Sequence, residues 1–175
     1  RMAPRRLSLA ALLLSFATVA CAATAGDPLP PLPQTLPALA PEAVQSRVDQ
    51  TVASLLSQYH YRKVKIDDAL SATVFDDYLD ALDFSHSFLM AKDVAELGEY
   101  RDQLDDELRG GRLGAAFAIY NRYQQRLLER TRRIGEQLAK PFDFRIDETY
   151  EVDRKKAPWA KSDVELDEIW RKRLK

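Results

Sequence analysis

Hydrophobic residues recur every three or four positions along most of the chain, which is the spacing of one face of an α-helix. A first set follows Pro41 and comprises Val44, Val48, Val52, Leu55, Leu56 and Tyr59. A second set follows Asp67 and Asp68, either of which can cap a helix N-terminus, and comprises Leu70, Val74, Phe75, Tyr78, Leu79 and Leu82. We therefore expect two helices here, each directing these side chains toward a core.

The second half of the chain predicts three further helices. The first spans about 91–109 and ends at Gly110-Gly111, because glycine tolerates left-handed backbone. The second spans about 113–140 and ends at Pro141. The third begins at Ser162, which forms a capping box with Glu165. Their inward positions are Val94, Leu97, Tyr100, Leu104 and Leu108; then Leu113, Ala116, Phe117, Tyr120, Tyr123, Leu127, Leu128, Ile134 and Leu138; then Val164, Leu166, Ile169, Trp170 and Leu174. The fold class is mainly α, with about five helices in an irregular bundle.

Two connecting segments carry their own signals. In 83–87 we expect Asp83 and Ser85 to bond turn backbone groups and His86 to pack at a helix start. Residues 142–152 alternate loosely and contain three aromatic side chains. This pattern predicts either a short strand or an extended arm.

The N-terminal segment reads as an export signal. Residues 1–25 combine three arginines, an apolar stretch over 7–20 and small residues that fit a cleavage site. The apolar stretch is too short to span a membrane. Cys21 lies in a sequence resembling a lipoprotein box, so lipidation and a soluble exported product are both open. Residues 26–41 contain six prolines, which predicts a polyproline-like tether or a disordered linker before a helical domain at 42–175.

Composition and charge exclude several kinds of chemistry. The 175 residues carry a formal net charge of −1, with a single Cys and two His. One Cys allows neither an intrachain disulfide framework nor a thiolate zinc site, and the charge does not favour nucleic acid as a partner. No nucleotide-binding or zinc-protease motif is present. We expect no cofactor.

Two small groups of residues contain the side-chain types of a catalytic or a metal site. Asp83, Ser85 and His86 contain the residue types of a serine triad, but near-adjacent residues rarely face one another as catalysis requires. His60, Asp67, Asp68 and His86 offer four metal-ligand types, but their spacing matches no known motif. We therefore assign no catalytic and no metal-binding residues.

Two cationic features suggest contacts rather than catalysis. Arginines at 122, 126, 130 and 133 form a helical stripe, which we interpret as a solvated face rather than a phosphate or acidic-partner site. In 153–159, three cations precede a proline and a tryptophan, an arrangement that suits an interface anchor. The candidates for interdomain or partner contact are Arg154, Lys155, Trp159 and Trp170.

These segments, taken in order, carry a family resemblance. They are 60–62, 67–69, 75–79, 82–86, 106–113, 140–144 and 153–159, with Leu166 and Trp170 beyond. Through them residues 44–175 resemble the N-terminal part of the bacterial tail-specific proteases, which process protein C-termini in the periplasm.

The resemblance implies more than the residues do. Members of this family are exported serine peptidases with a Ser/Lys dyad and a PDZ domain, and both lie beyond the region resembled. The chain would then be an N-terminal helical domain, inactive alone, that contributes scaffold and substrate or adaptor contacts in the periplasm. Implied partners are proteins with unstructured C-termini and a helical lipoprotein adaptor, with membrane contact only through the signal or Cys21. The alternative is a complete exported helical binding or scaffold protein, lipid-anchored through Cys21.

Overall fold

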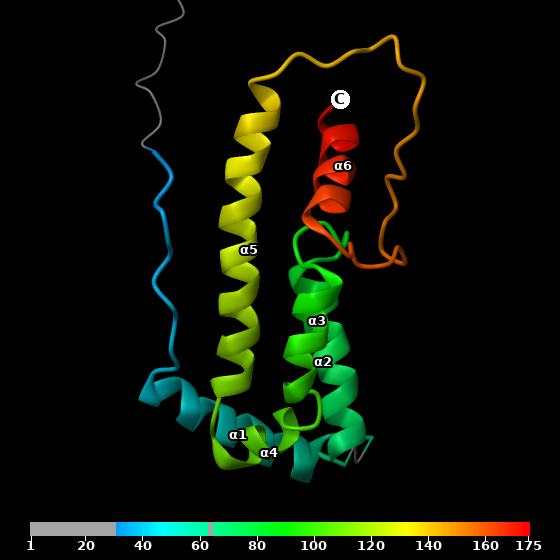
Figure 1. Cartoon of the computed structure of the whole chain (residues 1–175). Coiled ribbons are helices and arrows are strands. Elements are labelled where there is room, and N and C mark those ends of the chain that lie inside the picture. Colours follow the sequence, from blue (N-terminus) through cyan, green and yellow to red (C-terminus); the bar gives the residue numbers. More distant parts are fainter. Residues whose placement is uncertain (1–30, 63–64) are drawn as a thin grey trace, which may run out of the picture. The chain divides into compact units, whose positions relative to one another are not determined.

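The computed structural model describes residues 31–62 and 65–175, and in these ranges the chain is helical without a strand (Figure 1). The helices are α1 (Ala43–Tyr59), α2 (Asp68–Leu82), α3 (Ala91–Leu97), α4 (Leu104–Gly110), α5 (Gly114–Leu138) and α6 (Asp163–Leu174), with a 3-10 turn η1 (Gly98–Tyr100). The mainly α prediction is confirmed. Within the same ranges no helix is long and apolar enough to cross a membrane. The predicted signal and Cys21 lie outside the described residues.

The sequence signals at helix ends correspond to real caps. The Asp67 side chain accepts a hydrogen bond of 3.1 Å from the Leu70 amide at the start of α2. Ser162 accepts from the Glu165 amide at 3.2 Å and so begins α6. The Glu165 carboxylate, however, accepts from the Lys161 amide instead of the Ser162 amide. The predicted capping box is therefore half realised, with its second bond shifted by one residue.

The single helix predicted over 91–109 is wrong, because the chain breaks there into α3, η1 and α4. Gly98 follows α3, where its low helix propensity weakens continuation. The buried Ser71 hydroxyl of α2 then donates to the Arg101 carbonyl at 2.7 Å and accepts from the Leu104 amide at 3.0 Å. These two bonds replace helical ones, so the break satisfies its backbone groups through α2.

Two buried clusters form the core, and α5 lies beside both. The first joins α2, the 83–90 loop, α3 and α5, and the second joins the same loop to α6. Their buried members are Phe75, Leu79, Leu89, Leu97 and Ile119 in the first, and Met90, Ala160, Leu166 and Trp170 in the second. A parallel bridge between Met90 and Ala160 connects the 83–90 loop to the segment before α6.

The predicted inward face of α1 is the main error in the expected core. Val44, Val48, Val52, Leu55, Leu56 and Tyr59 are between 43% and 75% exposed, and Ala53 is the buried residue of this helix. Here α1 contacts α4 through its other side, where Gln50 donates to the Gly110 carbonyl. Helical periodicity indicated an apolar face correctly, but it could not show whether another element covers that face.

The segment between α5 and α6 is an extended arm, so the strand alternative is wrong for 142–152. Among the residues that the structure describes, no strand pairs with it, and its contacts are made by side chains instead. Asp143 accepts from the backbone and side chain of Arg145, which forms a local turn. Glu148 accepts from Arg171 and Lys175 of the C-terminal helix region, so the arm is fastened to α6.

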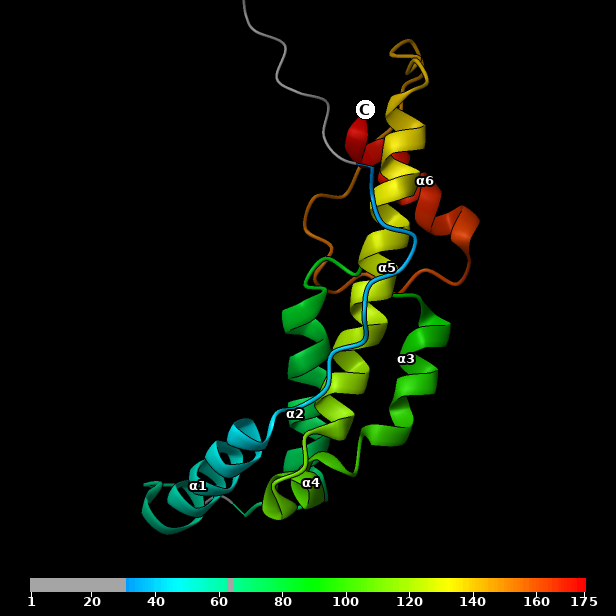
Figure 2. The ribbon, with the colours of Figure 1, turned by 90° about the vertical axis from the view of Figure 1, so that its left-hand side faces the viewer.

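Residues 32–41 of the proline-rich segment lie along α5 (Figure 2). The Leu39 backbone exchanges two hydrogen bonds of 2.8 Å with the Asn121 side chain. Farther along, Arg132 donates to the carbonyls of Pro33 and Gln34. Side chains of α5 thus bind the main chain of this part of the segment, and a tether or linker role for 26–41 stays a prediction.

Candidate functional site

The loop between α2 and α3 is organised by the Asp83 carboxylate. Asp83 is 1% exposed and accepts three backbone hydrogen bonds of 2.8 Å, from the amides of Ser87, Phe88 and Leu89. All three amides lie in the loop between α2 and α3, outside any helix or strand, so they need a side-chain acceptor. The expectation that Asp83 bonds turn backbone groups is confirmed, and its carboxylate is committed to structure.

His86 sits at the centre of this loop in a left-handed backbone conformation, with φ of 46°. Its Nδ1 lies 2.5 Å from the Ala157 carbonyl oxygen, and since a carbonyl only accepts, Nδ1 carries the proton. The ring stacks on Trp159 with 3.6 Å between centroids, and Nε2 faces Asp80 at 3.4 Å. Both ring nitrogens therefore point away from Asp83 and Ser85, which is not the geometry of a serine triad.

The four residues predicted as interface contacts divide into buried and exposed members. Trp170 is 7% exposed, and its Nε1 donates to the Ser87 carbonyl at 2.6 Å. Trp159 is half-buried against the first core cluster. Each tryptophan thus has partners inside the helical domain. Lys155 is exposed, with its Nζ 5.2 Å above the Phe84 ring, while Arg154 is half-buried. Their contact with another domain or partner stays a prediction.

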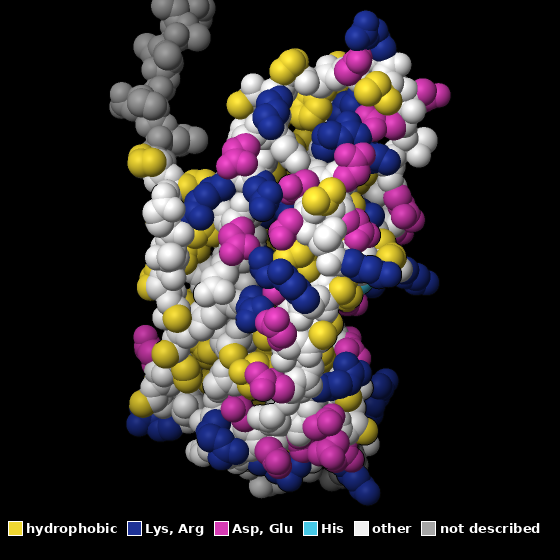
Figure 3. All heavy atoms as spheres, viewed as in Figure 1, with side chains coloured by type: hydrophobic (Ala, Val, Ile, Leu, Met, Phe, Trp, Pro, Cys, Tyr) yellow, Lys and Arg dark blue, Asp and Glu magenta, His cyan; other side chains and the backbone are white. Residues whose placement is uncertain are grey.

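The arginine stripe of α5 is not the solvated face that the sequence suggested. Arg122 and Arg126 bind Asp93 of α3 at 2.8 Å, while Arg130 and Arg133 bind Asp167 of α6 at 2.5 and 2.9 Å. The stripe cross-links three helices, and Figure 3 shows cationic and anionic side chains interspersed over them. The acidic partners lie on α3 and α6, so the sequence of α5 alone could not predict these ion pairs.

Asp93 is the most buried partner in this network, at 0% exposure. Burial alone would raise the pKa of its carboxyl group. Hydrogen bonds from Arg126, Arg122 and the Met90 amide favour the ionised form more strongly, so the pKa of Asp93 lies below its usual value. Asp93 therefore joins α3 to α5 as a charged, fully bonded group.

The side chains weighed as metal ligands do not converge. His60 contacts Tyr61 after α1, and Asp67 caps α2, whereas His86 binds the segment before α6. In 31–62 and 65–175, no three His, Cys, Asp or Glu side chains are grouped to hold a metal ion.

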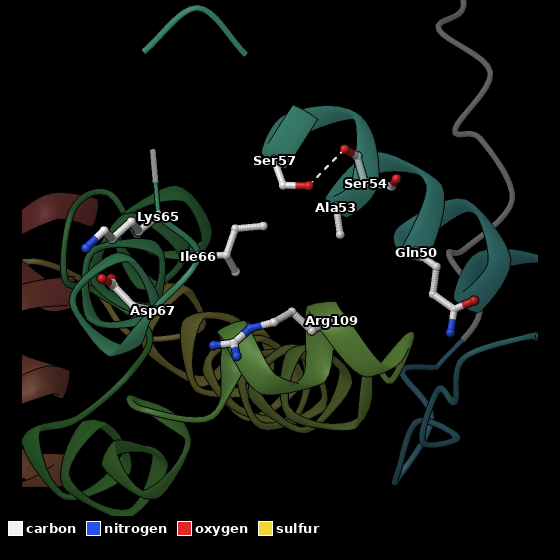
Figure 4. A pocket seen from close by; sticks show the side chains of 8 residues that line it. All are labelled: Gln50, Ala53, Ser54, Ser57, Lys65, Ile66, Asp67 and Arg109. Carbon is white, nitrogen blue, oxygen red and sulfur yellow. Dashed lines mark hydrogen bonds between the residues drawn. The ribbon is translucent and has the colours of Figure 1, made fainter. Parts of the chain in front are cut away.

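A hollow of about 580 Å³ lies between α1, α4 and the segment entering α2 (Figure 4). Three of its polar lining groups have partners within the domain: Ser57 donates to the Ser54 carbonyl, Arg109 pairs with Asp105, and Asp67 caps α2. A nucleophile needs an adjacent base, and the Ser57 hydroxyl bonds only to its own helix here. The hollow is therefore a groove between helices with a mixed apolar and polar lining, and Ser57 has no base beside it there.

The exposed hydrophobic residues of α1 form the best candidate for a functional surface. We call this surface the α1 apolar face; it comprises Val44, Val48, Val52, Leu55, Leu56 and Tyr59. Three of these valines border a second hollow of about 340 Å³ with Leu113 at the start of α5. Figure 3 shows hydrophobic side chains gathered where α1 meets the beginning of α5. Such a surface suits burial against another protein surface rather than chemistry on a small molecule.

Comparison with known proteins identifies the family. Residues 52–175 match the family model described as tail-specific protease N-terminal domain. The chain is also 34% identical over 148 residues to the tail-specific protease of Haemophilus influenzae. That match covers 84% of this chain and 21% of the relative, so the chain spans about a fifth of the relative's length. The chain therefore belongs to the tail-specific protease N-terminal domain family.

Proposed function

We propose that this chain is the non-catalytic scaffold domain of an exported tail-specific serine protease, and that the α1 apolar face packs against the rest of that protease. The observation that carries the proposal is the exposure of six large hydrophobic side chains along one helix. Family membership supports the protease context, because the matched relative is named a tail-specific protease.

The size and chemistry of the face favour a protein surface as its partner. Burying six roughly half-exposed apolar side chains would contribute roughly 5 kcal/mol before the costs of association are subtracted. A helix that lies on lipid usually carries several Lys or Arg on its polar face, whereas α1 carries only Arg47. About four-fifths of the relative lies outside the matched part, which is ample chain to cover the face.

The remaining functional assignments belong to the same proposal. Cleavage would use the family's Ser/Lys dyad, which no residue here matches. The substrates would be proteins with unstructured C-termini, delivered in some cases by a helical lipoprotein adaptor. The N-terminal sequence pattern supports export to the periplasm, with membrane attachment through Cys21 as an additional route. The role of this domain would be to position the protease body and to contact substrate or adaptor.

The proposal is tested in the full-length protease with two matched double variants. Val52→Asp with Leu55→Asp places two carboxylates on the α1 apolar face, and Thr51→Asp with Gln58→Asp places the same charge on exposed polar positions of the same helix. We expect the first pair to lower the thermal midpoint and slow cleavage of a protein with an apolar unstructured C-terminus. The Thr51 and Gln58 pair should leave both nearly unchanged.

A second measurement separates misfolding from lost packing. Far-ultraviolet circular dichroism of the 175-residue chain carrying Val52→Asp and Leu55→Asp should match that of the parent, because these side chains are already exposed. Full-length protease that retains its midpoint and cleavage rate with both changes would overturn the assignment of this face.

A further inference from the structure

We propose that one face of α5 is a recognition site for the main chain of an extended polypeptide, and that residues 33–39 occupy it intramolecularly. This inference goes beyond the proposed scaffold role and uses a different surface. We call the site the α5 main-chain site; it is defined by Asn121 and Arg132. An extended segment of another chain would bind there when 33–39 is displaced.

Asn121 and Arg132 bind backbone atoms of the segment rather than its side chains. The Asn121 amide accepts from the Leu39 N–H and donates to the Leu39 C=O, both at 2.8 Å, which is the pairing a neighbouring β-strand residue would make. The Arg132 guanidinium donates to two successive carbonyls, those of Pro33 and Gln34, the latter at 2.6 Å. Such bonds recognise an extended backbone of almost any sequence.

The spacing of the two side chains fits an extended ligand. Eleven residues separate Asn121 from Arg132, which corresponds to about 16 Å along a helix and about three full turns, so both lie on the same face. Five residues separate Leu39 from Gln34, which span about 16 Å in polyproline geometry. The distance between the two side chains along α5 therefore matches the distance between their partners along the segment. Figure 2 shows the segment running along α5.

The chemistry of the bound segment explains the choice of donors. Prolines lack an N–H, so a proline-rich segment offers mainly carbonyl acceptors. Arg132 supplies donors where Pro33 and Gln34 present those acceptors, and Asn121 supplies a donor and an acceptor where Leu39 presents both groups. A ligand in trans would need only free carbonyls at one end and one N–H about five residues later.

The segment is bound without being buried. Every residue in 31–41 is exposed except Leu36, which is half-buried. The contacts of 33–39 are therefore mostly side-chain to main-chain hydrogen bonds at the surface, and each such bond contributes little net stability. Covalent attachment keeps the segment at a high effective concentration, which compensates for weak contacts. Weakening the contacts of 33–39 with α5 should therefore allow a separate peptide to bind the site.

The first experiment tests the intramolecular contact in the full 175-residue chain. Hydrogen exchange at the Leu39 amide, followed by NMR, should be slow in the parent and accelerate about tenfold or more in Asn121→Ala. Glu136→Ala, at an exposed position farther along the same helix, is the control and should leave exchange at Leu39 unchanged. Unchanged Leu39 exchange in Asn121→Ala would overturn the proposal.

The second experiment tests binding in trans with a fluorescent peptide of residues 31–41. Leu39→Pro removes the N–H that Asn121 accepts and keeps extended backbone, whereas Leu39→Ala keeps the N–H. We expect the peptide to bind the Leu39→Pro chain about tenfold more tightly than the Leu39→Ala chain, and to lose binding when Asn121→Ala is added. Equal binding to the two Leu39 variants, or binding insensitive to Asn121→Ala, would overturn the inference.

Sedimentation of the parent chain distinguishes two sources of the bound segment. A monomer at all concentrations supports occupation by the chain's own residues. A concentration-dependent dimer that Leu39→Pro disperses would place the segment of a second copy in the site and would overturn the intramolecular assignment.

Discussion

Asp93 joins two helices through one buried carboxylate, and replacing it by Asn removes the charge while preserving the shape. The carboxylate accepts from Arg122 at 2.8 Å, from Arg126 at 2.8 and 2.9 Å, and from the Met90 amide at 3.0 Å. An asparagine keeps one acceptor oxygen and places an NH₂ group against a guanidinium. The variant therefore loses charge pairing and creates a donor–donor clash.

The expected cost follows from the burial of this residue. Removing one partner of a buried ion pair typically costs 3–5 kcal/mol. Arg122 and Arg126 retain Glu96 and Glu129 as exposed partners, so neither guanidinium is left unpaired. We therefore expect Asp93→Asn to lower the free energy of unfolding by about 3 kcal/mol, at the lower end of that range. The thermal midpoint should fall by roughly 10 °C.

Urea denaturation followed by circular dichroism measures this effect and its pH dependence. The pKa of Asp93 in the folded chain lies below its ordinary value of 3.8. Its contribution to stability is therefore complete above that value and is lost as the pH falls through the lower, folded-state pKa. The free energies of unfolding of the parent and of Asp93→Asn should differ by the full amount at neutral pH and become equal in acid.

The control is Asp106→Asn, since the Asp106 side chain is 69% exposed and lies 3.6 Å from Arg109. This change should cost less than about 0.5 kcal/mol. The reasoning about Asp93 fails if its replacement costs as little as this control, or if the cost is the same in acid and at neutral pH.

Three further predictions concern backbone conformation and the arm. Gly111→Ala should lower the free energy of unfolding by about 1–2 kcal/mol in urea titrations, because φ is +65° and a Cβ would meet Gln50 at 2.5 Å. His86→Ala should be less stable than His86→Gly by about 1 kcal/mol in the same assay, since φ is 46°; equal stabilities would refute strain at this position. The pKa of Glu148 is lowered to about 2, first by hydrogen bonding to Arg171, so fastening of the arm should be complete above about 4.5 and lost as pH falls toward 2. Backbone amide order parameters across 142–152, measured by NMR, should fall with pH in the parent and stay independent of pH in Glu148→Gln.

Local signals in the sequence predicted much of the helical framework. Asp67, Ser162 and Gly111 each act through bonds or dihedral angles within a few residues, so their effect can be read from neighbouring positions. The break between α3 and α4 depends on the Ser71 hydroxyl, which lies 30 residues earlier than its acceptor. A window along the sequence cannot contain that bond, and the apolar periodicity across the break suggested one continuous helix.

The candidate surfaces were less predictable for the same physical reason. Apolar spacing in α1 predicted burial, but burial requires a second element, and none covers Val48 or Val52 in the described chain. The α5 arginines were expected in solvent because their partners, Asp93 and Asp167, come from distant helices. Trp159 and Trp170 have their observed partners within the domain, and their contact with another domain or a partner stays a prediction.

The bridge between Met90 and Ala160 has a consequence for the order of folding. Together with the bond from Trp170 to Ser87, which spans 83 positions, it closes a long loop around α5 and the arm. Closing a loop of this length costs about 4 kcal/mol of chain entropy, which the second core cluster must offset before any gain appears. The contacts of the first cluster are closer in sequence and can form earlier. Docking of α6 should therefore be a late step, so truncating Leu166 would accelerate unfolding while leaving the folding rate nearly unchanged.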